Sequence, residues 1–101
     1  STIPYTRMVE SMREMDSDGI YRYADRDRYV SVQTPQVFPS DILLRSYEQG
    51  FSTEFTDDAS VVEKAGFPLS FMEGNRLNIK ITTPEDMRLA EAILSIGLDN
   101  L

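Results

Sequence analysis

The 101-residue sequence contains no cysteine and no histidine. Without these residues the chain cannot form a cysteine–histidine zinc cluster, present a thiol nucleophile or use a histidine as a general base. The absence of cysteine also fits a reducing compartment, so we expect a cytoplasmic location.

Basic residues are scarce, with 10 Lys and Arg against 17 Asp and Glu and a formal net charge of −7. Nucleic-acid binding needs a broad basic surface, so we expect no nucleic-acid partner and only a local phosphate site. No apolar run approaches the length of a membrane span, and the first residues lack the basic-then-apolar pattern of a signal peptide. We therefore expect no membrane partner.

Three segments have the pattern of helices that end at glycine. Ser40 is a candidate cap for the first, which stops before Gly50, and Thr56 is a candidate N-cap for the second, which runs to Gly66. The third begins with Thr83 as N-cap, followed by Pro84 and the acidic residue of a capping box, and it ends at Gly97.

The remaining segments have the pattern of strands. Alternation predicts strands at residues 29–34, 68–73 and 77–82, and a turn at residues 16–19 predicts a hairpin between the segments on either side of it. Strands that alternate with helices favour a layered α/β fold. A chain of 101 residues suits one small domain.

Three places could bind a ligand on spacing alone. Lys80 lies on the polar face of the expected strand 77–82, Thr56 lies at a helix N-terminus where a phosphate could bind, and residues 25–28 (Asp-Arg-Asp-Arg) could clamp an anion. Each has a structural alternative: a solvated lysine, an ordinary cap and a self-neutralising polar edge.

Taken in order, the segments QTPQVF, FTDDASVVEKAG and EGNRLNIKITTPEDMRLAE resemble the C-terminal half of the 2-C-methyl-D-erythritol 4-phosphate cytidylyltransferase family. The resemblance implies a partial Rossmann-like nucleotidyltransferase sheet with helices and a projecting β-arm. The arm would span about residues 4–28 and the core about residues 29–101 of a single domain.

The resemblance also implies a reaction, in which the phosphate of methylerythritol phosphate attacks the α-phosphate of CTP and magnesium pyrophosphate leaves. Lys80 and Arg26 match the family's catalytic positions. Ser11, Thr34 and Thr56, together with those two, match its substrate-binding positions. Ser11 stands where the family usually has threonine, and its hydroxyl can still bind phosphate.

In this family the arm reaches across a homodimer, which implies that Ser11 and Arg26 serve the partner's active site. The five glycines are scattered singly, so no glycine-rich loop that could cradle the CTP phosphates is present. We therefore expect a fragment without the CTP-binding half, inactive alone, with no metal site of its own.

Two other functions stay open at this point. Ribitol-5-phosphate cytidylyltransferase uses the same reaction on another polyol phosphate. A non-catalytic dimerisation module would account for both the arm and the absent glycine-rich loop.

Overall fold

The computed structural model describes residues 1–97. The last part of the expected core, residues 98–101, lies outside the described residues. Within the described part, β-strands fill the first third of the chain and two helices, a further strand and a third helix follow, which confirms the predicted α/β class.

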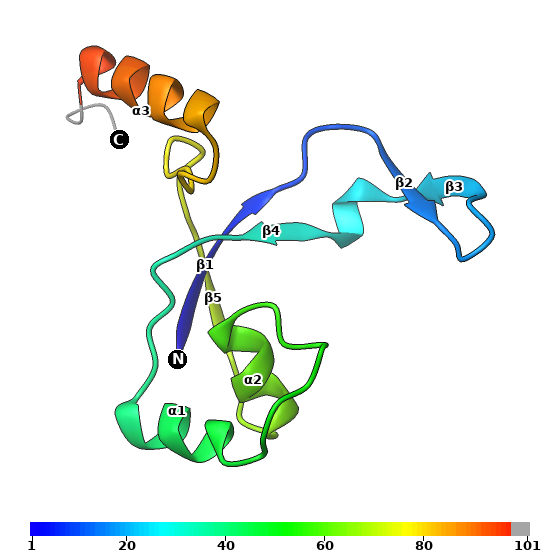
Figure 1. The fold of residues 1–101 in the computed structure, drawn as a ribbon, viewed down its shortest axis with the longest axis vertical. Coiled ribbons are helices and arrows are strands. Elements are labelled where there is room, and N and C mark those ends of the chain that lie inside the picture. Colours follow the sequence, from blue (N-terminus) through cyan, green and yellow to red (C-terminus); the bar gives the residue numbers. More distant parts are fainter. Residues whose placement is uncertain (98–101) are drawn as a thin grey trace.

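A sheet of three strands forms the centre of the molecule (Figure 1). β1 (Thr2–Arg7) is the middle strand, with β4 (Val30–Val32) antiparallel on one side and β5 (Ser70–Glu73) parallel on the other. Ile3 in β1 is fully buried, as expected for an apolar side chain on a central strand. Two of these strands are shorter than predicted, because only Val30–Val32 and Ser70–Glu73 find partners in the sheet.

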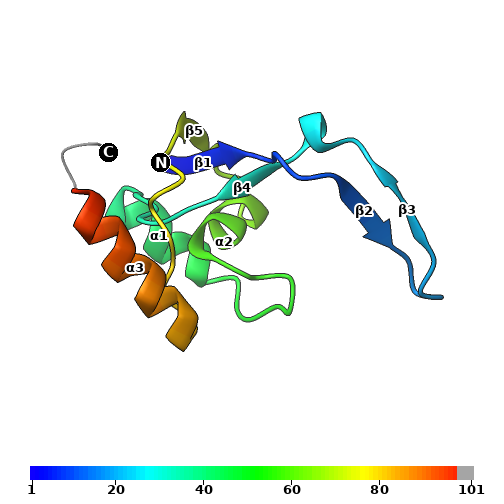
Figure 2. The ribbon, with the colours of Figure 1, turned by 90° about the horizontal axis from the view of Figure 1, so that it is seen from above.

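The predicted hairpin is present and projects from the sheet (Figures 1 and 2). It consists of β2 (Met12–Met15) and β3 (Tyr21–Ala24), which pair antiparallel. Its turn is held by Asp16, whose carboxylate accepts backbone N–H bonds from Asp18 at 2.9 Å and Ile20 at 3.0 Å. The expected arm range of about 4–28 thus contains most of β1, which lies in the central sheet, and then the hairpin.

α1 (Ser40–Tyr47) and α2 (Asp58–Lys64) pack against each other on one side of the sheet (Figure 2). Val61 and Val62 of α2 are almost completely buried and, with Ile3, form the centre of the core. The prediction that Ser40 caps α1 is wrong: Ser40 is the first helical residue, and the cap position holds Pro39. Proline has no side-chain acceptor, so the helix begins without a side-chain cap.

The predicted strand at residues 77–82 is wrong. After β5 the chain runs to α3 (Pro84–Ile96) without pairing to any strand of residues 1–97 (Figure 1). The sequence does alternate, but a strand also requires a neighbour that accepts and donates its backbone hydrogen bonds. Consequently Ile79 is only half-buried, and Ile81 is 51% exposed.

The start of α3 confirms the predicted capping box. Thr83 Oγ1 accepts from Asp86 N at 3.3 Å, and Asp86 Oδ2 accepts from the backbone N–H groups of Thr83 and Thr82, both at 2.9 Å. The backbone bonds from Thr82 and Thr83 hold the pKa of Asp86 below its ordinary value. Pro84 follows the cap, where its missing N–H costs nothing.

Thr83→Ala is expected to lower the free energy of unfolding by about 1 kcal/mol, because it removes the side chain of an N-cap. Urea unfolding measures the change. Thr53→Ala is the matched control, since Thr53 forms no side-chain hydrogen bond with other described residues and its loss should leave stability unchanged. Equal stability of both variants would show that the capping box contributes nothing to α3.

No helix within residues 1–97 is long and apolar enough to cross a bilayer.

Candidate functional site

Three of the residues singled out from the sequence meet in one place. Thr34, Thr56 and Lys80 line an open cavity of about 850 Å³ and also an adjoining one of about 370 Å³. They come from separate parts of the fold: the segment after β4, the residues before α2 and the connection between β5 and α3. The fold therefore assembles a site from residues that are distant in sequence.

Thr56 does not cap α2, which corrects the prediction made for it. The N-cap is Asp57, whose Oδ1 accepts from Ser60 N at 2.8 Å, while Ser60 Oγ accepts from the backbone N–H of Asp57 at 3.2 Å. Aspartate and threonine are both good caps. Only Asp57, however, is followed three residues later by a side chain, Ser60, that can accept a hydrogen bond from the backbone N–H of the cap residue. The hydroxyl of Thr56 is left available to the cavity that Thr56 lines.

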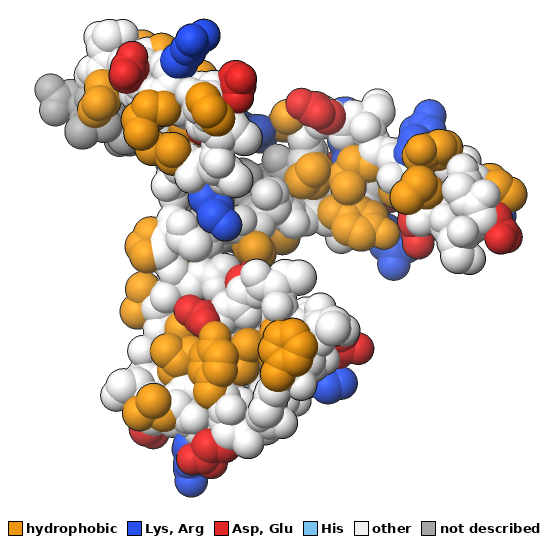
Figure 3. All heavy atoms as spheres, viewed as in Figure 1, with side chains coloured by type: hydrophobic (Ala, Val, Ile, Leu, Met, Phe, Trp, Pro, Cys, Tyr) orange, Lys and Arg blue, Asp and Glu red, His pale blue; other side chains and the backbone are white. Residues whose placement is uncertain are grey.

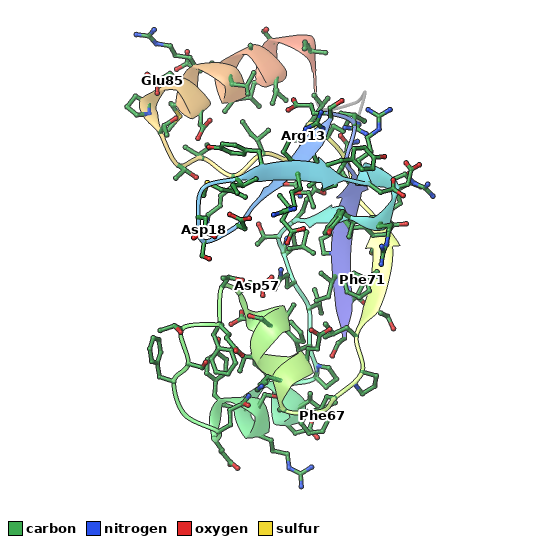
Figure 4. All side chains as sticks on the ribbon, turned by 90° about the vertical axis from the view of Figure 1, so that its right-hand side faces the viewer. Arg13, Asp18, Asp57, Phe67, Phe71 and Glu85 are labelled. Carbon is green, nitrogen blue, oxygen red and sulfur yellow. The ribbon has the colours of Figure 1, made fainter. Side chains whose placement is uncertain are left out.

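Gln36 joins the segment after β4 to the start of α2, a role that the sequence did not reveal. Its Nε2 donates to Asp57 Oδ2 at 3.0 Å, and its Oε1 accepts from Ala59 N at 3.1 Å. The two bonds lock both sides of the cavity together. The presence of a glutamine directly after Thr34-Pro35 could have suggested this role. A side-chain amide can accept a hydrogen bond from a free N–H in the first turn of a helix and at the same time donate one to the carboxylate of the cap. Figure 4 shows Asp57 at the start of α2, facing this segment.

The carboxyl group of Asp57 is held in its charged form. Burial raises the pKa of Asp57, but hydrogen bonds from Gln36 and Ser60 outweigh it, and the pKa lies below its ordinary value. The charged cap therefore stabilises the folded state at pH values above the ordinary pKa of an aspartate. This stabilisation is lost as the pH falls through the folded-state pKa.

Asp57→Asn is expected to reduce the loss of stability on acidification. Asparagine caps a helix about as well as aspartate but does not titrate. Urea unfolding at about pH 5 and at about pH 3 measures the effect: the difference in unfolding free energy between the two pH values should be smaller in the variant. Equal differences in the variant and the unchanged protein would show that this carboxylate does not contribute to acid sensitivity.

Lys80 is the cationic side chain of the cavity, and its ammonium group has no ion-pair or hydrogen-bond partner within residues 1–97. The neighbouring carboxylates are occupied by protein donors, since Asp57 binds Gln36 and Ser60, and Asp58 accepts from the phenol of Tyr47. The bond to Asp58 raises the pKa of Tyr47, so the phenol stays protonated. An anionic ligand in the cavity would thus meet an unengaged ammonium group.

Arg26 and Ser11 do not join this cavity. Arg26 lies in the short 3-10 helix after β3 (Arg26–Arg28), and its Nη1 donates to the carbonyl O of Val9 at 2.6 Å. It lines a separate cavity of about 640 Å³ beside Arg7 and Arg76, which shares no residue with the cavities at Lys80. Ser11 is exposed, just before β2.

The described residues do not offer a metal site. Within residues 1–97 no group of three or more Asp, Glu, His or Cys side chains comes together around a common point. The cavity's own carboxylates, Asp57 and Asp58, already accept hydrogen bonds. These residues do not fit Mg²⁺, which prefers several oxygen ligands in octahedral geometry.

Comparison with known proteins places the chain in a family. The family model of 2-C-methyl-D-erythritol 4-phosphate cytidylyltransferase (IspD) matches residues 1–96. The enzyme of that name from Bacteroides fragilis is 51% identical over 94 residues, which are 93% of this chain and 42% of that protein. The one from Porphyromonas gingivalis is 47% identical over 93 residues, 91% of this chain and 41% of that protein. The chain thus spans about two fifths of the length of these relatives.

Solved structures agree with the sequence comparison. The Thermus thermophilus 2-C-methyl-D-erythritol 4-phosphate cytidylyltransferase matches 91% of this chain, which corresponds to 46% of that protein, with a TM-score of 0.76 and 29% identity. The 4-diphosphocytidyl-2C-methyl-D-erythritol synthase from Anaerococcus prevotii matches 93% of this chain, which corresponds to 45% of that protein, with a TM-score of 0.79 and 29% identity. The expected partial Rossmann-like nucleotidyltransferase fold is therefore confirmed. The chain belongs to the 2-C-methyl-D-erythritol 4-phosphate cytidylyltransferase family.

Proposed function

We propose that a protein of the relatives' length containing this chain, called the complete protein below, transfers a cytidylyl group from CTP to 2-C-methyl-D-erythritol 4-phosphate in isoprenoid biosynthesis. An oxygen of the acceptor phosphate attacks the α-phosphorus of CTP, and the bond to the departing pyrophosphate breaks. The meeting of Thr34, Thr56 and the unengaged Lys80 at one cavity, in a chain of this family, supports the proposal.

The chemistry requires positioning and charge stabilisation, with no covalent intermediate. This suits a chain without cysteine or histidine. In the proposed site, Lys80 binds the acceptor phosphate next to the reacting phosphorus and stabilises the negative charge that develops there. The hydroxyl groups of Thr34 and Thr56 orient the acceptor.

The charge of the cavity indicates that Lys80 does not act alone. Lys80 is accompanied by Asp57 and Asp58, so the lining is not positive overall. Bringing two phosphate esters together needs more positive charge than this lining provides. We therefore propose that Arg26 of a second copy of the chain supplies the additional positive charge. In the proposed homodimer the arm of one copy reaches the cavity of the other and brings Arg26 and Ser11 to it.

The surface of the hairpin supports the dimer. Met15, Tyr21 and Tyr23 share one face of the paired strands, and their exposed fractions are 61%, 68% and 76%. Figure 3 shows hydrophobic side chains on the projecting hairpin. Large apolar side chains on an extended arm are typical of a surface that is covered in an assembly.

The CTP site and its Mg²⁺ are proposed to lie in the part of the complete protein beyond this chain, because the described residues offer neither a glycine-rich loop nor a set of metal ligands. A cytoplasmic location also stays a prediction. The relatives reported above are named for methylerythritol phosphate, which favours that acceptor over ribitol 5-phosphate and favours an enzyme over a dimerisation module.

Pyrophosphate release tests the proposal. The complete protein, given CTP, Mg²⁺ and methylerythritol phosphate, is expected to release pyrophosphate, whereas the 101-residue chain alone is expected to release none. Ribitol 5-phosphate serves as the control acceptor. Release with ribitol 5-phosphate only would assign the sister activity, and no release with either acceptor would favour the dimerisation module.

A further inference from the structure

The side chain of Gln33 ties the end of β4 to the loop that follows β5. Its Nε2 donates to the carbonyl oxygens of Asn75 at 2.8 Å and Asn78 at 3.2 Å, and its Oε1 accepts from Asn75 N at 3.3 Å. A fourth bond joins the same two segments in the opposite direction: Asn78 Nδ2 donates to the carbonyl O of Thr34 at 2.7 Å. These four bonds are called the Gln33 clamp.

Gly74 leaves the space that the clamp requires. The N–H of Gly74 donates to the carbonyl O of Tyr5 at 2.7 Å, which brings the loop against β1. A Cβ at this position would overlap Oε1 of Gln33 and lie 3.2 Å from the Tyr5 carbonyl O. Any side chain at residue 74 must therefore displace the amide of Gln33 or move the loop away from β1.

The clamp replaces the sheet bonds that residues 77–82 lack within the described part of the chain. An extended segment without a ladder of backbone bonds is held only where other contacts anchor it. Here the first anchor is Asn78, in the clamp, and the second is the pair of bonds from Thr82 and Thr83 to Asp86. Lys80 lies midway between the two anchors.

We propose that Gln33 is a positioning residue, which acts through the clamp to set the place of the Lys80 ammonium group at the cavity. Gln33 also adjoins Thr34, so one side chain fixes two lining residues relative to each other. The inference rests on the proposed function of Lys80. Gln33 itself lines the adjoining cavity of about 370 Å³, but its amide group is already bonded to Asn75 and Asn78. It therefore sets the reactivity of the site through geometry and not by binding substrate.

Gln33→Leu in the complete protein tests the role, since leucine keeps much of the volume and forms no hydrogen bond. Misplacing a charged group by about an ångström can cost up to about a hundredfold in rate, so kcat is expected to fall about tenfold or more, with the KM for CTP unchanged. The matched control is Gln49→Leu. Gln49 likewise donates to two carbonyl groups, those of Ser46 and Val61, each at 2.8 Å. Its own side chain lines neither cavity, and these two bonds do not involve the loop of residues 74–80 that leads to Lys80. Its kcat should remain near normal.

Two combined variants separate positioning from general damage. In a Lys80→Ala background, Gln33→Leu is expected to cause no further loss of kcat, because the group that it positions is gone. Gly74→Ala should cause a loss similar to that of Gln33→Leu, and the two together should cause no more than either alone. A full additional loss in the Lys80→Ala background would overturn the proposal.

Amide hydrogen exchange at residues 74–80 gives a readout that does not depend on catalysis. Gln33→Leu and Gly74→Ala are each expected to speed exchange there, while Gln49→Leu does not. Unchanged exchange in both variants overturns the clamp whether or not the protein is active. Faster exchange in a protein that never transfers a cytidylyl group would uphold the clamp and reject the proposed function. If Gln33→Leu fails to fold, Gly74→Ala decides by the same two measurements.

Discussion

Replacing Lys80 by alanine in the complete protein is expected to reduce turnover by roughly a hundredfold or more, the range seen when one preorganised electrostatic group is removed from an active site. The physical reason lies in the cavity. Lys80 is its lone cationic side chain among the described residues, and protein donors already occupy the carboxylates beside it. In the variant, water would fill the space left by the lysine side chain. Mobile water stabilises the negative charge that develops on the reacting phosphate less well than an ammonium group held in place.

Lys64→Ala is the matched control for this prediction. Lys64 is the other lysine of the chain, and its ammonium lies 3.7 Å from Glu54 on the surface, so its loss should leave turnover near normal. Steady-state release of pyrophosphate measures both variants. Near-normal turnover of Lys80→Ala would mean that Lys80 is a solvated surface lysine, the alternative that the sequence left open.

Arg26→Ala should also inactivate the complete protein, and mixing this variant with Lys80→Ala should restore activity. In a dimer of the two variants, the site with the intact Lys80 receives the intact Arg26 from its partner. Half of randomly mixed dimers are of this kind and each has one working site, so the mixture should reach about a quarter of the unchanged activity.

The mixing experiment distinguishes the two possible positions of Arg26. Its guanidinium donates to Val9 and lines a cavity that shares no residue with the one at Lys80. If Arg26 served the site of its own subunit, every site in the mixture would lack one group and no activity would return. Affinity purification of the mixture through different tags on the two variants confirms that mixed dimers have formed before activity is measured.

Local features of the fold could be predicted because their causes lie within a few residues. The Asp16 turn and the capping box of Thr83 depend on side chains that bond to backbone groups two to four positions away. The shift of the α2 cap from Thr56 to Asp57 is a small error of the same kind, since both residues can cap and the partner Ser60 decided between them.

The pairing of strands could not be predicted, because the alternation of apolar and polar residues does not show which segment a strand will pair with. The alternation at residues 77–82 predicted a strand, and this was wrong because no strand of the described chain pairs with the segment. The sequence pattern predicted no strand at the start of the chain, yet β1 is the middle strand of the sheet. Strand order is set by contacts across the whole chain, which periodicity cannot reveal.

The sequence by itself determined the class of the fold, the hairpin, both ends of α3 and the family, and through the family it pointed to Lys80, Thr34 and Thr56. Only the tertiary structure decided that these residues share a cavity, that Gln36 locks two sides of it, and that Gln33 holds the loop that leads to Lys80. The reason is distance along the chain. Gln33 and Asn75 are 42 residues apart, and a hydrogen bond of that span exists only once the sheet has brought β4 and β5 to opposite sides of β1.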